Sequence, residues 1–270
     1  MMAEAGLLGA IIGGSGVYAL GDGECDERVV ATAYGEVTLY LGRGASAGIV
    51  FLPRHGREHS VPPHRVNYRA NLKALASLGV QRVLATAAVG ALNERVAPGR
   101  LVLVDQFIDL TKGRPQTFYE GGASGVAHVD VTEPYCPSLR AALAAAAHRR
   151  GLACVEGATY ACTEGPRFET AAEVRLLAAW GADVVGMTGI PEAPLARELG
   201  LCYASVAIPM NWGAGLVDHR LDLSQSARYL EEGTRAAVQI CLDVLRAGGV
   251  APCACGTSLF VLHPPAGEGR

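Results

Sequence analysis

The sequence has no surplus of positive charge. Its 270 residues include 23 Lys and Arg against 26 Asp and Glu, which gives a formal net charge of −3 with His neutral. Proteins that bind nucleic acids need basic side chains to neutralise phosphates, so this balance disfavours such a partner. Only 18% of the residues are charged and 50% are hydrophobic. This composition excludes an intrinsically disordered chain.

Long apolar runs and recognisable targeting segments are also missing. No apolar stretch reaches the roughly 18 uninterrupted residues of a membrane span. The first 20 residues are apolar, but they contain Glu4 and several glycines and lack a basic start, unlike a signal peptide. Apart from Cys253 and Cys255, the eight cysteines lie singly, which is not the pattern of a secreted disulfide framework. We therefore expect a soluble, cytoplasmic protein.

Strand-like and helix-like segments alternate along the chain. Short apolar runs predict strands at 8–12, 37–41, 48–52, 82–89, 101–108, 183–187 and 202–208. Apolar residues at steps of three and four predict a helix at 66–78. Alanine content, an N-cap at Thr170 and terminal glycines predict further helices at 138–149, 170–180 and 224–247, and another is expected at 191–199 between two strands. The alternation predicts an α/β fold with a central mixed, largely parallel β-sheet flanked by helices. We expect one domain over 1–270, with a core of about 8–248 and a loose C-terminal tail.

Residues able to hold an anion follow two early strands. The run 13–16 reads GGSG, so backbone N–H groups and the Ser15 hydroxyl can converge on a negative charge. It is neither a GxGxxG fingerprint nor a P-loop, and a tight turn is the alternative. Arg54 and His55 begin the cationic run RHGREH, which suits phosphate or carboxylate but also a surface loop. No cysteine or carboxylate has ligand spacing around its histidines, so we predict no metal there.

Later strand ends carry groups suited to a planar ligand. Phe168 and Glu169 precede the helix 170–180, where a ring and a carboxylate can stack on and hydrogen-bond a heterocycle. Helix capping is the alternative for Glu169. Thr188 and Asn211 each follow a buried strand, a frequent ligand position in open α/β sheets, although both are also common turn residues. Together these residues predict an anion subsite beside a planar-ligand subsite.

The same segments resemble the trimeric purine nucleoside phosphorylase superfamily, in particular its methylthioadenosine and methylthioinosine phosphorylase branch. The segments that carry the resemblance are 11–16, 54–56, 66–71, 105–109, 114–119, 164–170, 181–188 and 191–192. In order and spacing they cover roughly residues 8–248. The resemblance implies a nucleoside phosphorylase-like fold and reversible phosphorolysis, in which inorganic phosphate attacks C1′ and the purine leaves. It implies phosphate as a co-substrate and neither a metal nor another cofactor.

The resemblance also implies roles for individual residues. The implied phosphate ligands are Ser15, Arg54, His55, Thr188 and the backbone near Ala87 and Ala88. The residues implied to surround the nucleoside are Phe168, Glu169, Met187, Asn211, Trp212, Gly213 and His128. Met187 is expected under the ribose and Phe168 against the base. The residues expected to act in catalysis are His55, Glu169 and Asn211.

The residues expected to contact the edge of the purine base favour one class of purine. Adenine-specific members carry Asp-x-Asp where this chain has Asn211-Trp212-Gly213, and 6-oxopurine enzymes carry a Glu at the position of Glu169. A carboxylate accepts the N1–H of hypoxanthine or guanine, whereas adenine N1 has no hydrogen to donate. Two mispaired groups at roughly 1–3 kcal/mol each give about 10²–10⁴-fold discrimination. We therefore expect 6-oxopurine specificity, with methylthioadenosine phosphorylase and a non-catalytic nucleoside-binding protein as alternatives.

The 5′ pocket and the oligomer are less determined. His128 matches a position that a neighbouring subunit lends to the site in this family, which implies a homotrimer; a surface-loop histidine is the alternative. The segment 214–230 is expected to flank the 5′ group. The candidate residues for contact with the 5′ group are both polar and apolar, so a 5′-hydroxyl and a 5′-methylthio group both remain open. These candidates are Asp218, His219, Ser226, Leu216, Val217, Leu223 and Leu230.

The pair Cys253-x-Cys255 resembles a CxC element near the C-terminus of some relatives, where it can form a local disulfide. Two reduced thiols are the alternative in a reducing cytosol. Two cysteines alone do not define a zinc site, so the sequence predicts none.

Overall fold

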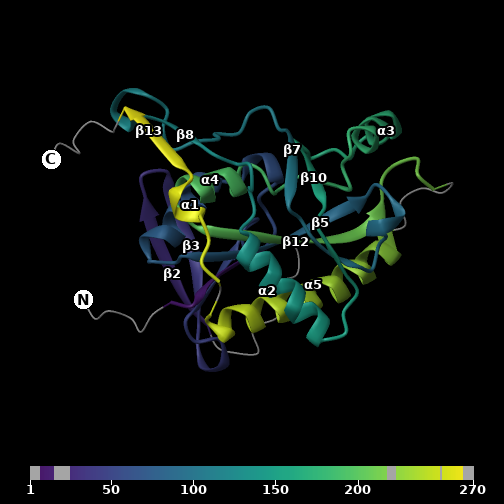
Figure 1. Ribbon diagram of the computed structural model, residues 1–270, viewed down its shortest axis with the longest axis horizontal. Helices are drawn as coiled ribbons and strands as arrows, with labels where there is room; N and C mark the ends of the chain where they lie inside the picture. The colour runs from purple at the N-terminus through teal and green to yellow at the C-terminus, as the bar shows by residue number, and fades with distance from the viewer. Residues whose placement is uncertain (1–6, 15–24, 218–222, 250, 264–270) are drawn as a thin grey trace.

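The computed structural model describes residues 7–14, 25–217, 223–249 and 251–263. Eleven strands of this part form one sheet, which helices cover on both faces, and two further strands pair separately (Figure 1). The large sheet is mixed, with six parallel and four antiparallel pairings. The expected α/β fold with a largely parallel sheet is confirmed.

In the described part, residues 54–67 and 111–125 form the longer connections between successive strands and α-helices. The strands of the large sheet are β1 (Gly9–Gly13), β2 (Cys25–Thr32), β3 (Gly35–Gly42), β4 (Ile49–Pro53), β5 (Arg82–Ala91), β6 (Leu101–Leu103), β7 (Gln106–Leu110), β9 (Cys154–Glu156), β10 (Thr159–Thr163), β11 (Val184–Gly186) and β12 (Cys202–Trp212). The separate pair is β8 (Val126–Val129) and β13 (Leu259–His263). The α-helices are α1 (Tyr68–Ser77), α2 (Pro137–Arg149), α3 (Ala171–Ala179), α4 (Glu192–Glu198) and α5 (Leu223–Ala247).

The central strand β5 organises the sheet. On one edge it pairs with β12 along its full length. On the other edge β1 runs parallel to residues 83–85, whereas β11 runs antiparallel to residues 90–91. The carboxyl ends of β1 and β11 therefore approach each other along β5. Among the described strands, none pairs with residues 86–89 on this edge, which opens a gap in the ladder.

Alternation along the strands sorts the core onto two faces, because successive strand residues point to opposite sides. Ile12 packs in a cluster with Leu72 of α1 and Leu195 of α4. Its neighbour Ile11 packs in a second cluster with residues of α2 and α5, such as Leu143. Figure 1 shows α2 and α5 side by side on that second face.

Most predicted helices and strands are confirmed within a few residues. The single strand expected at 101–108 is wrong: the chain breaks after β6, because the N–H groups of Asp105 and Gln106 both turn to the carbonyl of Ala158, and β7 then pairs with β10. The sequence analysis missed β2, β8, β9 and β13, and it expected a strand ending at Thr163, which is β10, without giving its bounds. The tail holds more structure than expected, since β13 pairs with β8, although 264–270 lie outside the described residues.

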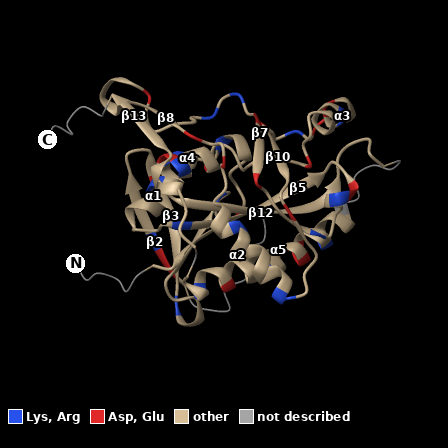
Figure 2. Ribbon diagram, viewed as in Figure 1, with Lys and Arg blue, Asp and Glu red and all other residues tan. Residues whose placement is uncertain are grey.

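Charges are mixed over the surface. Basic and acidic segments alternate across the visible face, and neither sign gathers over one group of elements (Figure 2). In the part that the structure describes, no helix is both long and apolar enough to cross a membrane.

Candidate functional site

A cavity of about 1300 Å³ opens where the strands around β5 end. Its lining comes from the carboxyl ends of β1, β4, β11 and β12 and from the segment before α3. Ten of the thirteen predicted site residues line it, and they are Arg54, His55, Ala88, Phe168, Glu169, Met187, Thr188, Asn211, Trp212 and Gly213. The gap in the β5 ladder lies at the same place, since Ala88 belongs to both. The strand-end residues that were predicted to meet therefore do meet.

A buried ion pair anchors the anion end of the cavity. Arg54 donates from Nε and Nη2 to the two carboxylate oxygens of Glu192, at 2.9 and 2.7 Å, and neither side chain is exposed. Its Nη1 donates to the carbonyl of Thr86 at 2.8 Å. Burial disfavours the Arg54 cation, but the Glu192 carboxylate outweighs burial, so the pKa of Arg54 is raised. The guanidinium is thus a fixed positive charge with N–H groups left for a ligand.

Glu192 is itself held in place. The Tyr203 hydroxyl donates to Glu192 Oε2 at 2.8 Å, and burial together with this carboxylate raises the pKa of Tyr203. Glu192 begins α4, while Tyr203 lies on β12. Two elements therefore set the geometry of the carboxylate that orients Arg54.

His55 is a neutral group in this site. Burial, and then the neighbouring Arg54 charge, lower the pKa of His55 to about 4. Its Nδ1 lies 2.8 Å from the carbonyl of Val61, which can only accept, so Nδ1 carries the hydrogen. At neutral pH the other ring nitrogen, Nε2, is consequently an acceptor.

Met187 and Thr188 follow β11 and are positioned by two buried side chains. The N–H of Thr188 donates to the Tyr160 hydroxyl at 3.2 Å, and a Cβ on Gly186 would collide with that hydroxyl. Arg114 donates to the carbonyl of Met187 at 2.9 Å. It also donates to the carbonyls of Glu164 at 2.8 Å and Ile190 at 2.5 Å, so one cation ties the ends of β10 and β11 together.

The other end of the cavity is more open. Phe168 is 61% exposed at the cavity mouth. Glu169 accepts a hydrogen bond from the Thr163 hydroxyl at 2.7 Å. The capping role considered for Glu169 falls instead to Glu173, which forms a capping box with Thr170 at the start of α3. Glu169 therefore keeps carboxylate lone pairs for a ligand.

Asn211 faces the same region from β12, beyond a bulge in the strand. Its Nδ2 donates to the carbonyl of Trp212 at 2.8 Å, which leaves one N–H and the side-chain oxygen for a ligand. Gly213 is closely packed: a Cβ there would lie 3.0 Å from Leu92 and from Val174. An Asp at this position would require its neighbours to move.

Three predicted residues lie elsewhere. Ser15 falls outside the described residues, although Gly14 beside it lines the cavity. Ala87 is buried in β5 and is not among the lining residues. His128 is exposed on β8 and does not line the cavity of its own chain.

Of the residues predicted to flank the 5′ group, some line the cavity and others lie outside the described residues. Val217 and Ser226 line the cavity, together with Gln225 and Tyr229, which the sequence analysis did not name. Asp218 and His219 lie outside the described residues. The lining on this side is thus both apolar and polar.

Comparison with known proteins identifies the family. The family model described as the phosphorylase superfamily matches residues 10–246. The chain belongs to this superfamily. It is 50% identical over 241 residues to the 6-oxopurine nucleoside phosphorylase of Pyrococcus furiosus, which covers 87% of this chain and 91% of that protein. It is also 47% identical over 230 residues to the probable S-methyl-5′-thioinosine phosphorylase of Methanopyrus kandleri, which covers 84% and 89%.

A solved structure of the superfamily shares the whole fold. The methylthioadenosine phosphorylase from an antarctic soil metagenomic library superposes with a TM-score of 0.87 at 35% identity, over 95% of this chain and 91% of that one. The resemblance expected from the sequence is therefore confirmed, as is the assignment of the chain as a phosphorylase.

Sequence reasoning missed the residues that support this phosphorylase site. Glu192 and Arg114 stand in the segments that carried the resemblance, but no role was given to them, and Tyr203 and Thr86 were not considered. The available signal was Glu192 itself, an acidic residue shortly after β11. Sequence alone cannot pair it with Arg54, because the two residues are 138 positions apart along the chain.

Proposed function

We propose that this phosphorylase cleaves the N-glycosidic bond of 6-oxopurine nucleosides, either inosine and guanosine or 5′-methylthioinosine. Inorganic phosphate is the co-substrate, and the products are the free purine and ribose 1-phosphate or its 5-methylthio analogue. The observation that carries the proposal is that Glu169 and Asn211 share one cavity with the Arg54 anion site.

The anion end suits hydrogen phosphate. Arg54 supplies a fixed positive charge, and Thr188 and the Ala88 region supply further groups at the gap beside β5. Neutral His55 presents Nε2 as an acceptor, so it pairs with the one protonated oxygen of HPO₄²⁻ rather than adding a second charge. The remaining phosphate oxygens are then free to face C1′ of the ribose. Holding the nucleophile in this orientation is the main contribution such a site makes to the rate.

The base end suits a 6-oxopurine. Glu169 accepts the N1–H, and the remaining N–H of Asn211 donates to O6 or N7, where negative charge develops as the base leaves. Adenine would place an acceptor against the Glu169 carboxylate and a donor where Asn211 donates. Leaving each of these groups mispaired costs roughly 1–3 kcal/mol.

The rival substrate is 5′-methylthioadenosine, which the structural likeness to a methylthioadenosine phosphorylase favours. The residues at 211 and 213 oppose it, because neither is the Asp of an Asp-x-Asp pair, and an Asp at 213 would fit only if Leu92 and Val174 moved. Both polar and apolar residues line the 5′ side, so the 5′ substituent of the substrate stays open.

We also propose a homotrimer in which His128 serves a neighbouring subunit. It lies on β8 opposite Phe260 of β13, and Phe260 is 58% exposed. Val261 and Leu262 on the same strand are about half exposed as well, at 47% and 56%. His128 does not line the cavity of its own chain, and it lies beside an exposed apolar strand. Exposed apolar surface of this kind is typical of a contact between subunits.

The test is base release from inosine, guanosine, 5′-methylthioinosine and 5′-methylthioadenosine, each with and without phosphate. We expect phosphate-dependent release of hypoxanthine or guanine, with adenine release lower by about 10²-fold or more. Adenine release that outpaces hypoxanthine release would refute the proposed base specificity. Nucleoside binding without turnover would indicate a non-catalytic binding protein.

A further inference from the structure

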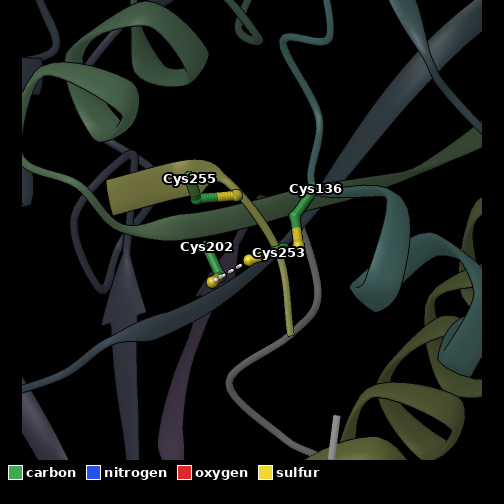
Figure 3. Close-up of side chains that lie close together, drawn as sticks. All are labelled: Cys136, Cys202, Cys253 and Cys255. Carbon is green, nitrogen blue, oxygen red and sulfur yellow. Dashed lines mark hydrogen bonds between the residues drawn. The ribbon is translucent and has the colours of Figure 1, made fainter. Parts of the chain in front are cut away.

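Four of the eight cysteines meet in one place. The sulfur atoms of Cys136, Cys202, Cys253 and Cys255 all lie within 4.8 Å of one another. Figure 3 shows the four side chains gathered where the tail passes the start of α2 and the start of β12. Cys136 precedes α2, Cys202 begins β12, and the other two belong to the C-terminal tail. The sequence analysis considered only the tail pair and therefore predicted no zinc site.

The spacing of the sulfurs suits a tetrahedral ion. The Sγ atoms of Cys202 and Cys253 lie 3.3 Å apart, so this pair is not covalently bonded, and all four residues are free cysteines. A zinc ion with Zn–S bonds of about 2.3 Å places its four sulfurs about 3.8 Å apart. The 3.3 Å pair and the upper limit of 4.8 Å lie on either side of that spacing. Four thiolates are also the ligand set of structural zinc sites.

We propose that these four cysteines bind one structural Zn²⁺. Binding replaces four thiol protons, which pass to solvent, by one metal ion. Each chain provides all four ligands, so the site needs neither substrate nor a second subunit.

The backbone around the cluster is already arranged for binding. The N–H of Cys136 donates to the carbonyl of Tyr203 at 2.7 Å, which fixes the α2 side against β12. On the tail, the hydroxyls of Thr257 and Ser258 both donate to the carbonyl of Ala254, at 3.0 and 3.3 Å. This turn holds Cys253 and Cys255 on either side of Ala254.

The tail needs such an anchor. Of its described residues, Cys255 and Ser258 are buried, whereas the apolar side chains of β13 are largely exposed. Within one chain, apolar burial therefore contributes little to holding residues 251–258, whereas β13 is held by its pairing with β8. A metal that bridges Cys253 and Cys255 to α2 and β12 attaches the tail at a second place.

The site is structural rather than catalytic because of its position on β12. Cys202 begins this strand, and Asn211 lies near its other end. Nine steps at about 3.3 Å each separate the two by roughly 30 Å. Loss of zinc should therefore loosen the tail and lower the thermal stability while leaving the chemistry of a folded chain intact.

The experiment is metal analysis of the full chain purified without chelators. We expect about one zinc per chain in the wild type and in Cys25→Ser, whose thiol on β2 lies outside the cluster, and little zinc in the Cys253→Ser/Cys255→Ser double variant. The double variant, or the wild type after chelation, should melt lower by roughly 5 °C. Phosphorolysis measured well below that temperature should change less than about twofold, because a 30 Å separation leaves the reacting groups in place.

Counting thiols separates zinc from the competing chemistry. All eight cysteines should titrate in denaturant with chelator and without reductant. Only four titratable thiols in a metal-free chain would mean two disulfides and would overturn the proposal. A different metal at one per chain would overturn the assignment of zinc, and zinc retained by the double variant would overturn the assignment of its ligands.

Discussion

The two ends of the cavity are built differently. At the phosphate end, Arg54 and Glu192 are fully buried and hydrogen-bonded on several sides before any ligand arrives. At the base end, Phe168 is largely exposed, and the Glu169 side chain makes a single described hydrogen bond, with Thr163. The first end belongs to strands and a helix packed in the core, whereas the second is carried by the segment before α3 and the bulged end of β12.

This difference separates what a phosphorylase must keep from what it can vary. Every substrate of the proposed reaction requires the same phosphate, and a rigid charge holds it without reorganisation. Purines differ only along one edge, so a few side chains on a looser frame are enough to select among them. Changes at the phosphate end should therefore affect folding and activity together, whereas changes at the base end should affect nucleoside binding and selectivity without a comparable loss of stability.

The strongest test of the comparison is Glu192→Gln. It leaves the buried Arg54 without its counter-charge, so the free energy of unfolding should fall by roughly 3 kcal/mol. The KM for phosphate should rise more than kcat falls, because Glu192 positions Arg54 and does not itself touch the nucleoside. Denaturant unfolding and phosphate titration measure the two effects.

The matched control is Tyr203→Phe, which removes only one hydrogen bond to Glu192 and should cost about 1 kcal/mol. A Glu192→Gln chain with wild-type stability and wild-type phosphate KM would show that the phosphate end is not the rigid element described above.

Glu169→Gln should act on selectivity without a comparable loss of stability. Loss of the carboxylate weakens the contact with N1–H, so kcat/KM for inosine should fall by about 10–100-fold, whereas the slow cleavage of adenosine should change little. Glu173→Gln, which alters the capping box outside the cavity, should leave the inosine-to-adenosine ratio unchanged. An equal loss on both nucleosides would contradict the role given to Glu169.

The neutral state of His55 predicts a pH dependence of stability. The unfolded histidine titrates near 6.5 and the folded one near 4, so the unfolded chain holds more protons between these values. The His55 contribution is thus complete above pH 6.5 and is lost as the pH falls toward 4. His55→Asn keeps an N–H for the carbonyl of Val61 but removes the titration. Unfolding free energies of both chains across this range should converge at low pH, and parallel curves would refute the assigned state.

The smallest effect is expected at Phe168. Phe168→Ala should raise the nucleoside KM by about 3–10-fold through loss of aromatic packing on the base. Its melting temperature should stay near that of the wild type, because the ring is 61% exposed. Trp180→Ala is the control, since Trp180 is 54% exposed beside the same helix but does not line the cavity. A marked loss of stability in Phe168→Ala would place that ring in the rigid part of the site.

The sequence predicted the strand-end residues because parallel strands bring their carboxyl ends to one edge, so Arg54, Glu169 and Asn211 could be expected together. It did not predict what orients them. Glu192 begins α4 and Arg54 follows β4, so the two meet only in the folded chain, and no local sequence pattern predicts their pairing. The zinc ligands were missed for the same reason, since three distant segments supply them. The break after β6 was missed because an apolar run does not reveal where hydrogen-bond partners change.

The gap beside β5 gives the sheet an unfinished seam. Between the carboxyl ends of β1 and β11, no described strand pairs with the backbone amides of residues 86–89 on this edge, and Ala88 and Val89 line the cavity. An anion that accepts hydrogen bonds from these N–H groups would take the place of a neighbouring strand. Bound phosphate should then slow amide hydrogen exchange in this stretch of β5, while amides facing β12 exchange at the same slow rate with or without phosphate. Phosphate binding would in that sense complete the hydrogen bonding of β5.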